Sequence, residues 1–322
     1  MNKAIGLVAV LAVGAGVALL TLSGRPGAAP TRGADAWNVP DVSSLPDDEW
    51  GRMVRRGREL VSHTAALIGP AAADPALRFA GNNLDCQSCH IAAGTKQFGL
   101  PYVGVYGDFP SYRAREGRIG TLEDRINGCL MRSMNGRAMP DASPEMKAMV
   151  AYIQFLSTGR PAGAKTKGRG SGKMAELTRA ADPVRGRAVF VQTCAACHGQ
   201  NGQGQRADDG APGYAVPPLW GPDSFNDGAG MARLGTAANF VRSNMPHGAD
   251  WRAPVVGEED AWDVAAYLIS QPRPHKEGLD ADYPKRKEKP VDAPYGPYAD
   301  SFSAEQHKFG PFAPIRKALG KE

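Results

Sequence analysis

The chain has 322 residues, of which 42% are hydrophobic and 22% are charged, so it is long enough for two ordinary domains with hydrophobic cores. Its formal net charge at pH 7 is only +5, and its lysines and arginines do not alternate with aromatic residues as they do in nucleic-acid-binding surfaces. We therefore expect no nucleic acid among its partners. A mildly basic surface favours anionic small molecules or an acidic redox partner.

The first residues have the pattern of an export signal. Lys3 precedes an apolar run over residues 4–22. The run is also just long enough to cross a bilayer, so residues 1–24 are predicted to be either a cleaved signal or a retained membrane anchor. In both cases we expect the rest of the chain in the periplasm, soluble or attached to the inner membrane.

A sequence unit occurs twice in the same order, which predicts two similar domains. Each copy contains an Arg-Gly-Arg segment, a C-x-x-C-H motif, a Met-Pro pair and a helical stretch that includes Ala-Tyr. The first copy has these features at 56–58, 86–90, 139–140 and 149–153, and the second has them at 185–187, 194–198, 245–246 and 264–268. The predicted domains span residues 45–161 and 184–272.

Both predicted domains begin and end with a helix. Apolar residues recur at helical spacing over 49–68. Ser143 is a suitable cap for a helix that starts with Pro144, and Glu258 and Glu259 place negative charge at the start of the last helix of the second domain. The fold class is therefore mostly α-helical.

Two segments lie outside these domains. Residues 162–183 contain a run rich in Gly, Ser and Lys, which is typical of a flexible linker. Residues 273–322 are Pro-rich and polar, so this C-terminal extension is predicted to build no core of its own. It is expected either to be loose or to drape over the domains.

The two C-x-x-C-H motifs predict covalent attachment of two haems c. In such a motif both thiols bond to the haem and the histidine binds its iron. A zinc site would need additional Cys or His ligands, and a disulfide pair would not need the histidine. The motifs thus indicate two class I cytochrome c-like domains in tandem. The attachment residues are Cys86, Cys89, Cys194 and Cys197, and the iron-binding histidines are His90 and His198.

The second axial ligand of each haem is less evident from the motifs. Met245 is the candidate opposite His198, with His247 as its nearest rival. Opposite His90, the repeat favours Met139, whereas the cysteine count favours Cys129, the one cysteine outside the two motifs. An unpaired thiol outside the cytoplasm is a liability unless it is shielded, bound to metal or used chemically. Both alternatives are open on these grounds.

Longer stretches of the chain resemble the dihaem thiosulfate dehydrogenase family over residues 45–322. The resemblance is carried by GTLEDRINGCLMRSMNG at 120–136, by AGTK at 93–96, PYVGVY at 101–106 and FPSYR at 109–113, and by KPVD at 289–292, GPYAD at 296–300 and EQHK at 305–308. It implies that Cys129 is an axial ligand of the first haem and a catalytic residue. Met245 would ligate the second haem, but Asn244 stands where some relatives have a lysine beside that methionine.

The resemblance also implies an activity. Two thiosulfate ions would be oxidised to tetrathionate at the haem of the first domain, and the electrons would pass through the second haem to a periplasmic redox protein. A solvated basic loop is the plain interpretation of the arginines near Cys129, but guanidinium groups also suit sulfonate oxygens. The predicted substrate-binding residues are Arg113, Arg115, Arg118, Arg125 and Ser133.

Three other functions compete with this one. A dihaem cytochrome that only transfers electrons would need neither Cys129 nor an arginine cluster. A sulfur-oxidising cytochrome that loads thiosulfate onto a carrier protein would also use a cysteine ligand. A dihaem peroxidase would need an open haem site, against which the methionine and cysteine candidates argue.

Overall fold

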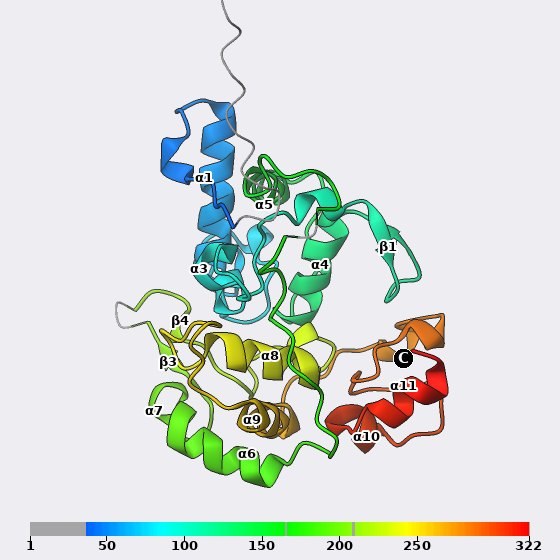
Figure 1. The fold of residues 1–322 in the computed structure, drawn as a ribbon. Helices are drawn as coiled ribbons and strands as arrows, with labels where there is room; N and C mark the ends of the chain where they lie inside the picture. Colours follow the sequence, from blue (N-terminus) through cyan, green and yellow to red (C-terminus); the bar gives the residue numbers. More distant parts are fainter. Residues whose placement is uncertain (1–36, 165, 208–209, 322) are drawn as a thin grey trace, which may run out of the picture. The chain divides into compact units, whose positions relative to one another are not determined.

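The computed structural model describes residues 37–164, 166–207 and 210–321 (Figure 1). The predicted export signal or anchor at residues 1–24 lies outside this part of the chain. Among the described residues, no helix is both long and apolar enough to cross a membrane. The described chain is mostly helical, with two short antiparallel hairpins.

The first half of the chain is organised around the crossing of its first and last helices, α1 and α5. Gly57 of α1 lies at this crossing, where a Cβ atom would come within 2.0 Å of the carbonyl oxygen of Ala148 in α5. The backbones can therefore approach this closely only because Gly57 has no side chain. The elements of this half are α1 (Glu49–Ser62), α2 (Thr64–Ile68), α3 (Ile91–Gly94), β1 (Ser111–Arg113), β2 (Arg118–Gly120), α4 (Leu122–Arg132) and α5 (Pro144–Phe155).

The second half repeats this crossing with helices α6 and α9. A Cβ atom on Gly186 of α6 would lie 1.9 Å from the carbonyl oxygen of Asp263 in α9. The repeated Arg-Gly-Arg segment thus marks the same helix crossing in both halves. The elements are α6 (Pro183–Val189), α7 (Ala195–His198), β3 (Gln205–Arg206), β4 (Tyr214–Val216), α8 (Leu234–Asn244) and α9 (Glu258–Ser270).

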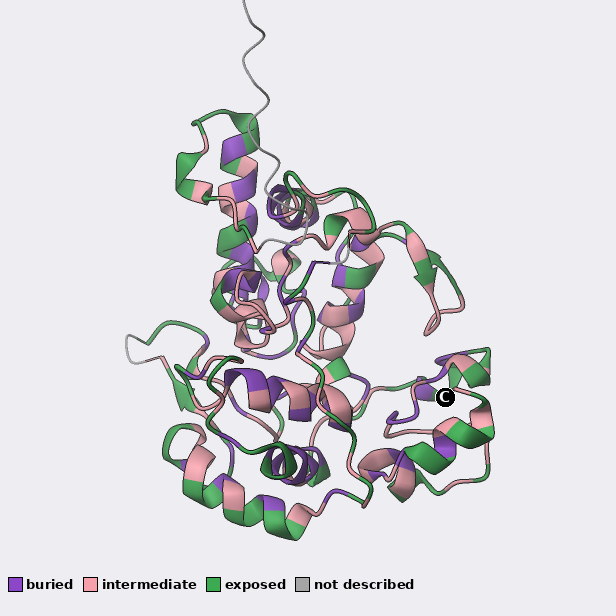
Figure 2. Ribbon diagram, in the orientation of Figure 1, coloured by how far each residue is buried: buried purple, intermediate pink, exposed green. Residues whose placement is uncertain are grey.

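The predicted helix starts are confirmed. The Ser143 hydroxyl accepts a hydrogen bond from the Met146 amide at 3.2 Å, and α5 begins at Pro144. Helix α9 begins at Glu258 with three acidic residues in its first turn. Helices α5 and α9 are largely buried (Figure 2). Helix α5 contacts α1 and α4, and α9 contacts α6 and α8.

The predicted helix over 49–68 is interrupted at His63, whose backbone is not helical. After this break, the Thr64 hydroxyl donates to the carbonyl oxygen of Leu60 at 2.7 Å and accepts from the Cys86 amide at 3.0 Å. The break therefore places a polar side chain where it fixes the start of the first C-x-x-C-H motif.

The C-terminal extension drapes over the chain, as one of the two predicted alternatives has it. It forms α10 (Ala304–Phe309) and α11 (Ala313–Leu319). Phe312 and Ile315 are buried in one cluster with Leu234 and Trp262 of the second half. The extension thus completes a core that it could not build alone.

The glycine-rich segment between the halves makes specific backbone contacts. The carbonyl oxygens of Gly168 and Gly170 accept hydrogen bonds from the amides of Phe98 and Leu100, at 2.6 and 3.0 Å. Both glycines have positive φ angles, which other residues rarely adopt. Part of the predicted linker is therefore held against the first half, and the domain boundaries themselves stay predictions.

Candidate active site

The first half encloses a cavity of about 610 Å³, a size typical of cofactor sites. Its polar lining includes both thiols of the first motif, His90, Arg125 and Cys129, and the rest is mainly apolar. The apolar lining residues include Leu84, Leu100, Tyr102, Val105, Leu122, Ile126, Leu130, Met134, Met149 and Ile153. An apolar cradle with two thiols and an imidazole on its wall fits a covalently attached haem.

The histidine of each motif is oriented by a backbone carbonyl group. Nδ1 of His90 is hydrogen-bonded to the carbonyl oxygen of Leu100, and Nδ1 of His198 lies 2.9 Å from that of Pro217. A carbonyl oxygen can only accept, so Nδ1 carries the proton and Nε2 keeps its lone pair. Both histidines are thus prepared to bind a metal through Nε2.

The loop that follows His90 has an uncommon backbone. Ala92, Ala93, Phe98 and Leu100 all have positive φ angles between 52° and 55°. Non-glycine residues adopt this conformation at a cost, which is tolerated where the surrounding contacts enforce it. Here the conformation brings the Leu100 carbonyl group back to His90.

Helix α4 brings Arg125 and Cys129 together. Thr121 caps the helix with a reciprocal capping box that includes Asp124. Arg125 and Cys129 are one turn apart on the same face, and Nη1 of Arg125 donates to Sγ of Cys129 at 2.7 Å. Burial opposes ionisation of the thiol, but Arg125 and His90 outweigh it and lower the pKa of Cys129 to about 6.

Met139, the rival candidate opposite His90, is buried in the hydrophobic core, with 1% of its surface exposed. Its backbone amide and carbonyl groups are held by the side chain of Asn127, at 2.8 and 2.9 Å. Cys129 instead lines the cavity and interacts with His90. The geometry therefore favours Cys129, which the spacing within the repeat did not.

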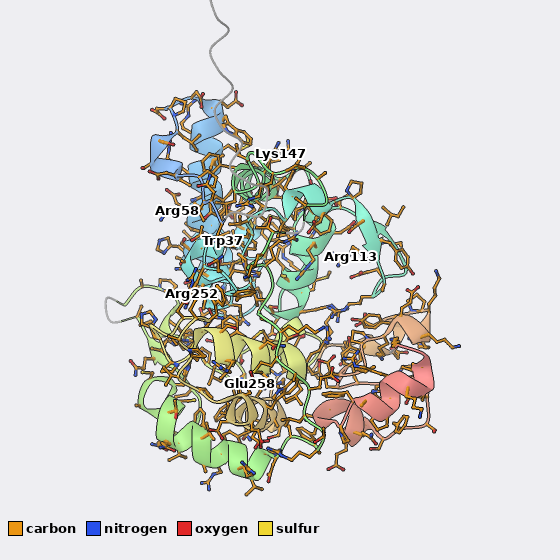
Figure 3. All side chains as sticks on the ribbon, viewed as in Figure 1. Trp37, Arg58, Arg113, Lys147, Arg252 and Glu258 are labelled. Atoms are coloured by element: carbon orange, nitrogen blue, oxygen red, sulfur yellow. The ribbon has the colours of Figure 1, made fainter. Side chains whose placement is uncertain are left out.

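The predicted substrate-binding residues occupy different environments. Arg125 and Ser133 line the cavity. Arg113, beside helix α4 in Figure 3, is paired with Glu116 at 2.8 Å, and Arg118 is paired with Asp124 at 2.6 Å. The charges of Arg113 and Arg118 are thus compensated within the protein, outside the cavity lining.

Arg115 has partners that the sequence did not indicate. Its Nε donates to the phenol oxygen of Tyr283 at 3.3 Å and lies 4.0 Å from a carboxylate oxygen of Asp282. Both partners belong to the C-terminal extension. A second residue missed from the sequence is Arg169, which lines the cavity from the glycine-rich segment and pairs with Asp108. In the sequence, the resemblance of segments within 289–308 to a known family was the one sign that the extension takes part in the site.

In the second half, Cys194 and Met245 pack against the same cluster, which contains Phe190, Trp220 and Tyr267. His247, the rival of Met245, is exposed. The apolar and aromatic surroundings of Cys194, with the oriented His198, fit a second covalently attached haem.

Asn244, directly before Met245, is buried and connects the two halves. Its side-chain amide donates to the carbonyl oxygens of Phe98, at 2.9 Å, and of Phe240, at 3.1 Å. Phe98 belongs to the loop that follows His90. The segment that carries Met245 is thereby tied to the loop that orients the histidine of the first site.

Two family matches follow the division into halves. Residues 79–162 match the family described as "SoxA/TsdA, cytochrome c domain", and residues 183–272 match "Cytochrome c". The two matches separate a specialised first domain from a general second domain.

The curated relatives extend the similarity across both domains. A thiosulfate dehydrogenase from Allochromatium vinosum is 44% identical over 243 residues, which cover 74% of this chain and 85% of that protein. A thiosulfate dehydrogenase from Psychrobacter arcticus is 39% identical over 246 residues, covering 76% and 71%. The solved thiosulfate dehydrogenase (TsdBA) from Marichromatium purpuratum superposes with a TM-score of 0.68 at 33% identity. That match covers 75% of this chain and half of the other, longer chain.

Proposed function

The chain belongs to the TsdA-type thiosulfate dehydrogenase family, and from this membership we propose that it oxidises thiosulfate. In the proposed reaction, two thiosulfate dianions form one S–S bond to give one tetrathionate dianion and two electrons. No proton is taken up or released in this balance.

One observation carries the proposal: His90, Cys129 and Arg125 converge on one cavity. An electron-transfer cytochrome has no need for a guanidinium group beside a candidate iron ligand. An enzyme that must bring two dianions together does need one, because like charges at close range repel strongly in a partly desolvated site.

We infer that each domain holds one haem c. Cys86 and Cys89 would attach the first haem, with His90 and Cys129 as its axial ligands. Cys194 and Cys197 would attach the second haem, with His198 and Met245 as its axial ligands. When bound, the two groups would supply one-electron acceptors, the thiolate-ligated one at a lower potential than the methionine-ligated one.

The residues of the chain would hold and orient the substrate. Arg125 is the cation nearest Cys129, and a guanidinium group binds sulfonate oxygens through two parallel hydrogen bonds. Ser133 ends the same helix and can add a hydroxyl donor. Thiosulfate bound by these groups would present its outer sulfur towards Cys129.

The electrons would leave through the second domain to a redox protein. The predicted export signal at residues 1–24 supports a periplasmic acceptor and a periplasmic enzyme. Domain limits of 45–161, 184–272 and 273–322 are consistent with this division of labour.

The function is tested with purified holoprotein, thiosulfate and ferricyanide as the electron acceptor. We expect thiosulfate-dependent ferricyanide reduction and one tetrathionate for every two ferricyanide ions reduced. A shuttle would show no thiosulfate-dependent reduction. A cytochrome that loads thiosulfate onto a carrier would form no tetrathionate unless that carrier were added.

A further inference from the structure

The C-terminal extension reaches the first domain at Arg115 from two directions. The Tyr283 amide donates to the carbonyl oxygen of Arg115 at 2.7 Å, and Nε of Arg115 donates to the Tyr283 phenol oxygen at 3.3 Å. The guanidinium carbon also lies 5.7 Å from the centre of the Tyr283 ring. The backbone of Tyr283 thus holds the backbone of Arg115, and its side chain holds the guanidinium group.

Asp282 adds a buried negative charge at the same place. Its carboxylate accepts from Nη2 of Arg132 at 2.7 Å and from the Tyr295 phenol at 2.6 Å, and only 7% of the residue is exposed. Arg132 is the last residue of α4, the helix that carries Arg125 and Cys129. Asp282 therefore links the extension to Arg115, which precedes Cys129 in the sequence, and to Arg132, which follows it. A buried ionic link of this kind is costly to break because it leaves a charge without its partner.

The backbone of Tyr283 is strained in a way that serves this arrangement. Its φ angle is 57°, in the left-handed region that non-glycine residues adopt at a cost. In this conformation the amide and the phenol of Tyr283 both reach Arg115. The same conformation puts Asp282 next to Arg132.

Arg115 is held with one edge engaged and one edge available. Its Nε is bound by the extension, whereas its two terminal nitrogens have no hydrogen-bond partner among the residues that the structure describes. Burial opposes the charge on Arg115, but Tyr283, Tyr295 and Asp282 outweigh it and raise the pKa of Arg115. The outer edge of a guanidinium group fixed in this way suits two oxygens of an anion.

Asp282 also ties Arg115 to helix α4. Its carboxylate lies 4.0 Å from Nε of Arg115 and 2.7 Å from Nη2 of Arg132, the last residue of α4. Ser133, which follows Arg132, lines the cavity. The extension thus holds Arg115 beside the end of α4 that reaches the cavity.

We propose that Asp282 and Tyr283 of the C-terminal extension are positioning residues, which fix Arg115 beside the C-terminal end of α4 so that the outer edge of its guanidinium group binds the same anionic substrate as Arg125. This inference rests on the proposed oxidation of thiosulfate. It assigns a part of the substrate site to a segment that lies outside both haem domains.

The test uses Tyr283→Phe in the holoprotein, which removes the acceptor of the Arg115 Nε hydrogen bond and keeps the aromatic ring. We expect the KM for thiosulfate to rise roughly tenfold, the lower range for a lost hydrogen bond to a charged group, with kcat near wild type. Tyr112→Phe is the matched control. It removes a 2.7 Å hydrogen bond between Tyr112 and Glu288, which joins the same hairpin to the same extension without contacting Arg115.

A double substitution separates positioning from general stabilisation. If Tyr283 acts through Arg115, Tyr283→Phe combined with Arg115→Gln should show no greater loss than Arg115→Gln alone. Additive losses, an unchanged KM in Tyr283→Phe, or an equal effect of Tyr112→Phe would overturn the inference while wild-type turnover keeps the proposed function intact. Absence of thiosulfate oxidation in the wild type would overturn both.

Discussion

The two halves of the chain share a scaffold and differ in the helix that leads to the proposed second ligand. Helices α4 and α8 each have 11 residues, and each half has a histidine oriented by a backbone carbonyl group. One turn before Cys129, helix α4 carries Arg125. One turn before Met245, at the end of α8, stands Val241, which is buried. The residue at this position, Arg125 in one half and Val241 in the other, thus distinguishes a cavity that can hold an anion from an apolar site.

The difference suggests how one duplicated unit can support two roles. A cation beside Cys129 attracts an anionic substrate, whereas an apolar residue one turn before Met245 excludes one. A site that only relays electrons works better without such a substrate. The following changes test this comparison, from the largest expected effect to the smallest.

Cys129→Ala should have the largest effect, because it removes the proposed ligand and reactive sulfur together. We expect tetrathionate formation to fall by roughly 10³-fold or more, as when a central member of a catalytic unit is lost. The potential of the first haem should rise, since a thiolate stabilises ferric iron. Electron paramagnetic resonance should show loss of the low-spin thiolate signal.

Met139→Ala is the matched variant, because it tests the rival ligand of the same haem. It should lower stability and leave the spectrum of the first haem intact. An unchanged spectrum in Cys129→Ala, together with a changed one in Met139→Ala, would reverse our assignment.

Arg125→Val gives α4 the residue that α8 has one turn before Met245, which is Val241. We expect kcat/KM for thiosulfate to fall by about 10²–10³-fold, the scale of removing one group that stabilises charge in a transition state. Steady-state kinetics with ferricyanide measure this fall. Arg118→Gln should stay near wild type, because Arg118 is paired with Asp124 outside the cavity. Equal losses in the two variants would mean that the cavity is not the substrate site.

Met245→Ala should change the second haem, because it removes the proposed ligand and leaves the hydrogen bond from Asn244 to Phe98 in place. Methionine ligation raises the potential of a haem, so we expect that potential to fall and the thiosulfate turnover to slow. Redox titration followed by visible absorption measures both haems separately. His247→Ala should be silent, and a shift there comparable to that of Met245→Ala would favour the exposed histidine as ligand.

Gly57→Ala and Gly186→Ala test the helix crossing that the two halves share. Each added methyl group would meet a backbone oxygen within about 2 Å, so each should lower the free energy of unfolding by about 1–3 kcal/mol. Gly230→Ala is the control, because its methyl group would meet nothing within 4 Å. Urea unfolding compares the three. A loss in one crossing alone would show that the halves do not rely on the same packing.

Much of the fold was predictable from local signals. The repeated motifs marked both halves, and Ser143-Pro144 marked the start of α5, because a helix cap depends on neighbouring residues. The break at His63 was missed, because the Thr64 hydroxyl that follows it binds the amide of Cys86, far along the chain. Glycine content suggested freedom for 162–183, but Gly168 and Gly170 provide close backbone contacts.

The site was less predictable than the fold. Spacing could not separate Cys129 from Met139, because the choice depends on which side of α4 faces the cavity. Glu116 and Asp124 stand close enough in the sequence to have indicated the pairing of Arg113 and Arg118. The partners of Arg115 could not be foreseen from spacing, because Tyr283 lies 168 residues further on.

The hydrogen bond from Asn244 to Phe98 gives the two centres a shared mechanical support. Phe98 is two residues from Leu100, whose carbonyl group orients His90, and Asn244 is bonded directly to Met245. A movement of Met245 would therefore strain the loop that holds His90. Electrons move quickly between centres whose surroundings shift little when the charge changes. With Met245 as the proposed ligand of the second haem, its attachment to Asn244 would keep that reorganisation small, at the cost of the freedom to exchange ligands during turnover.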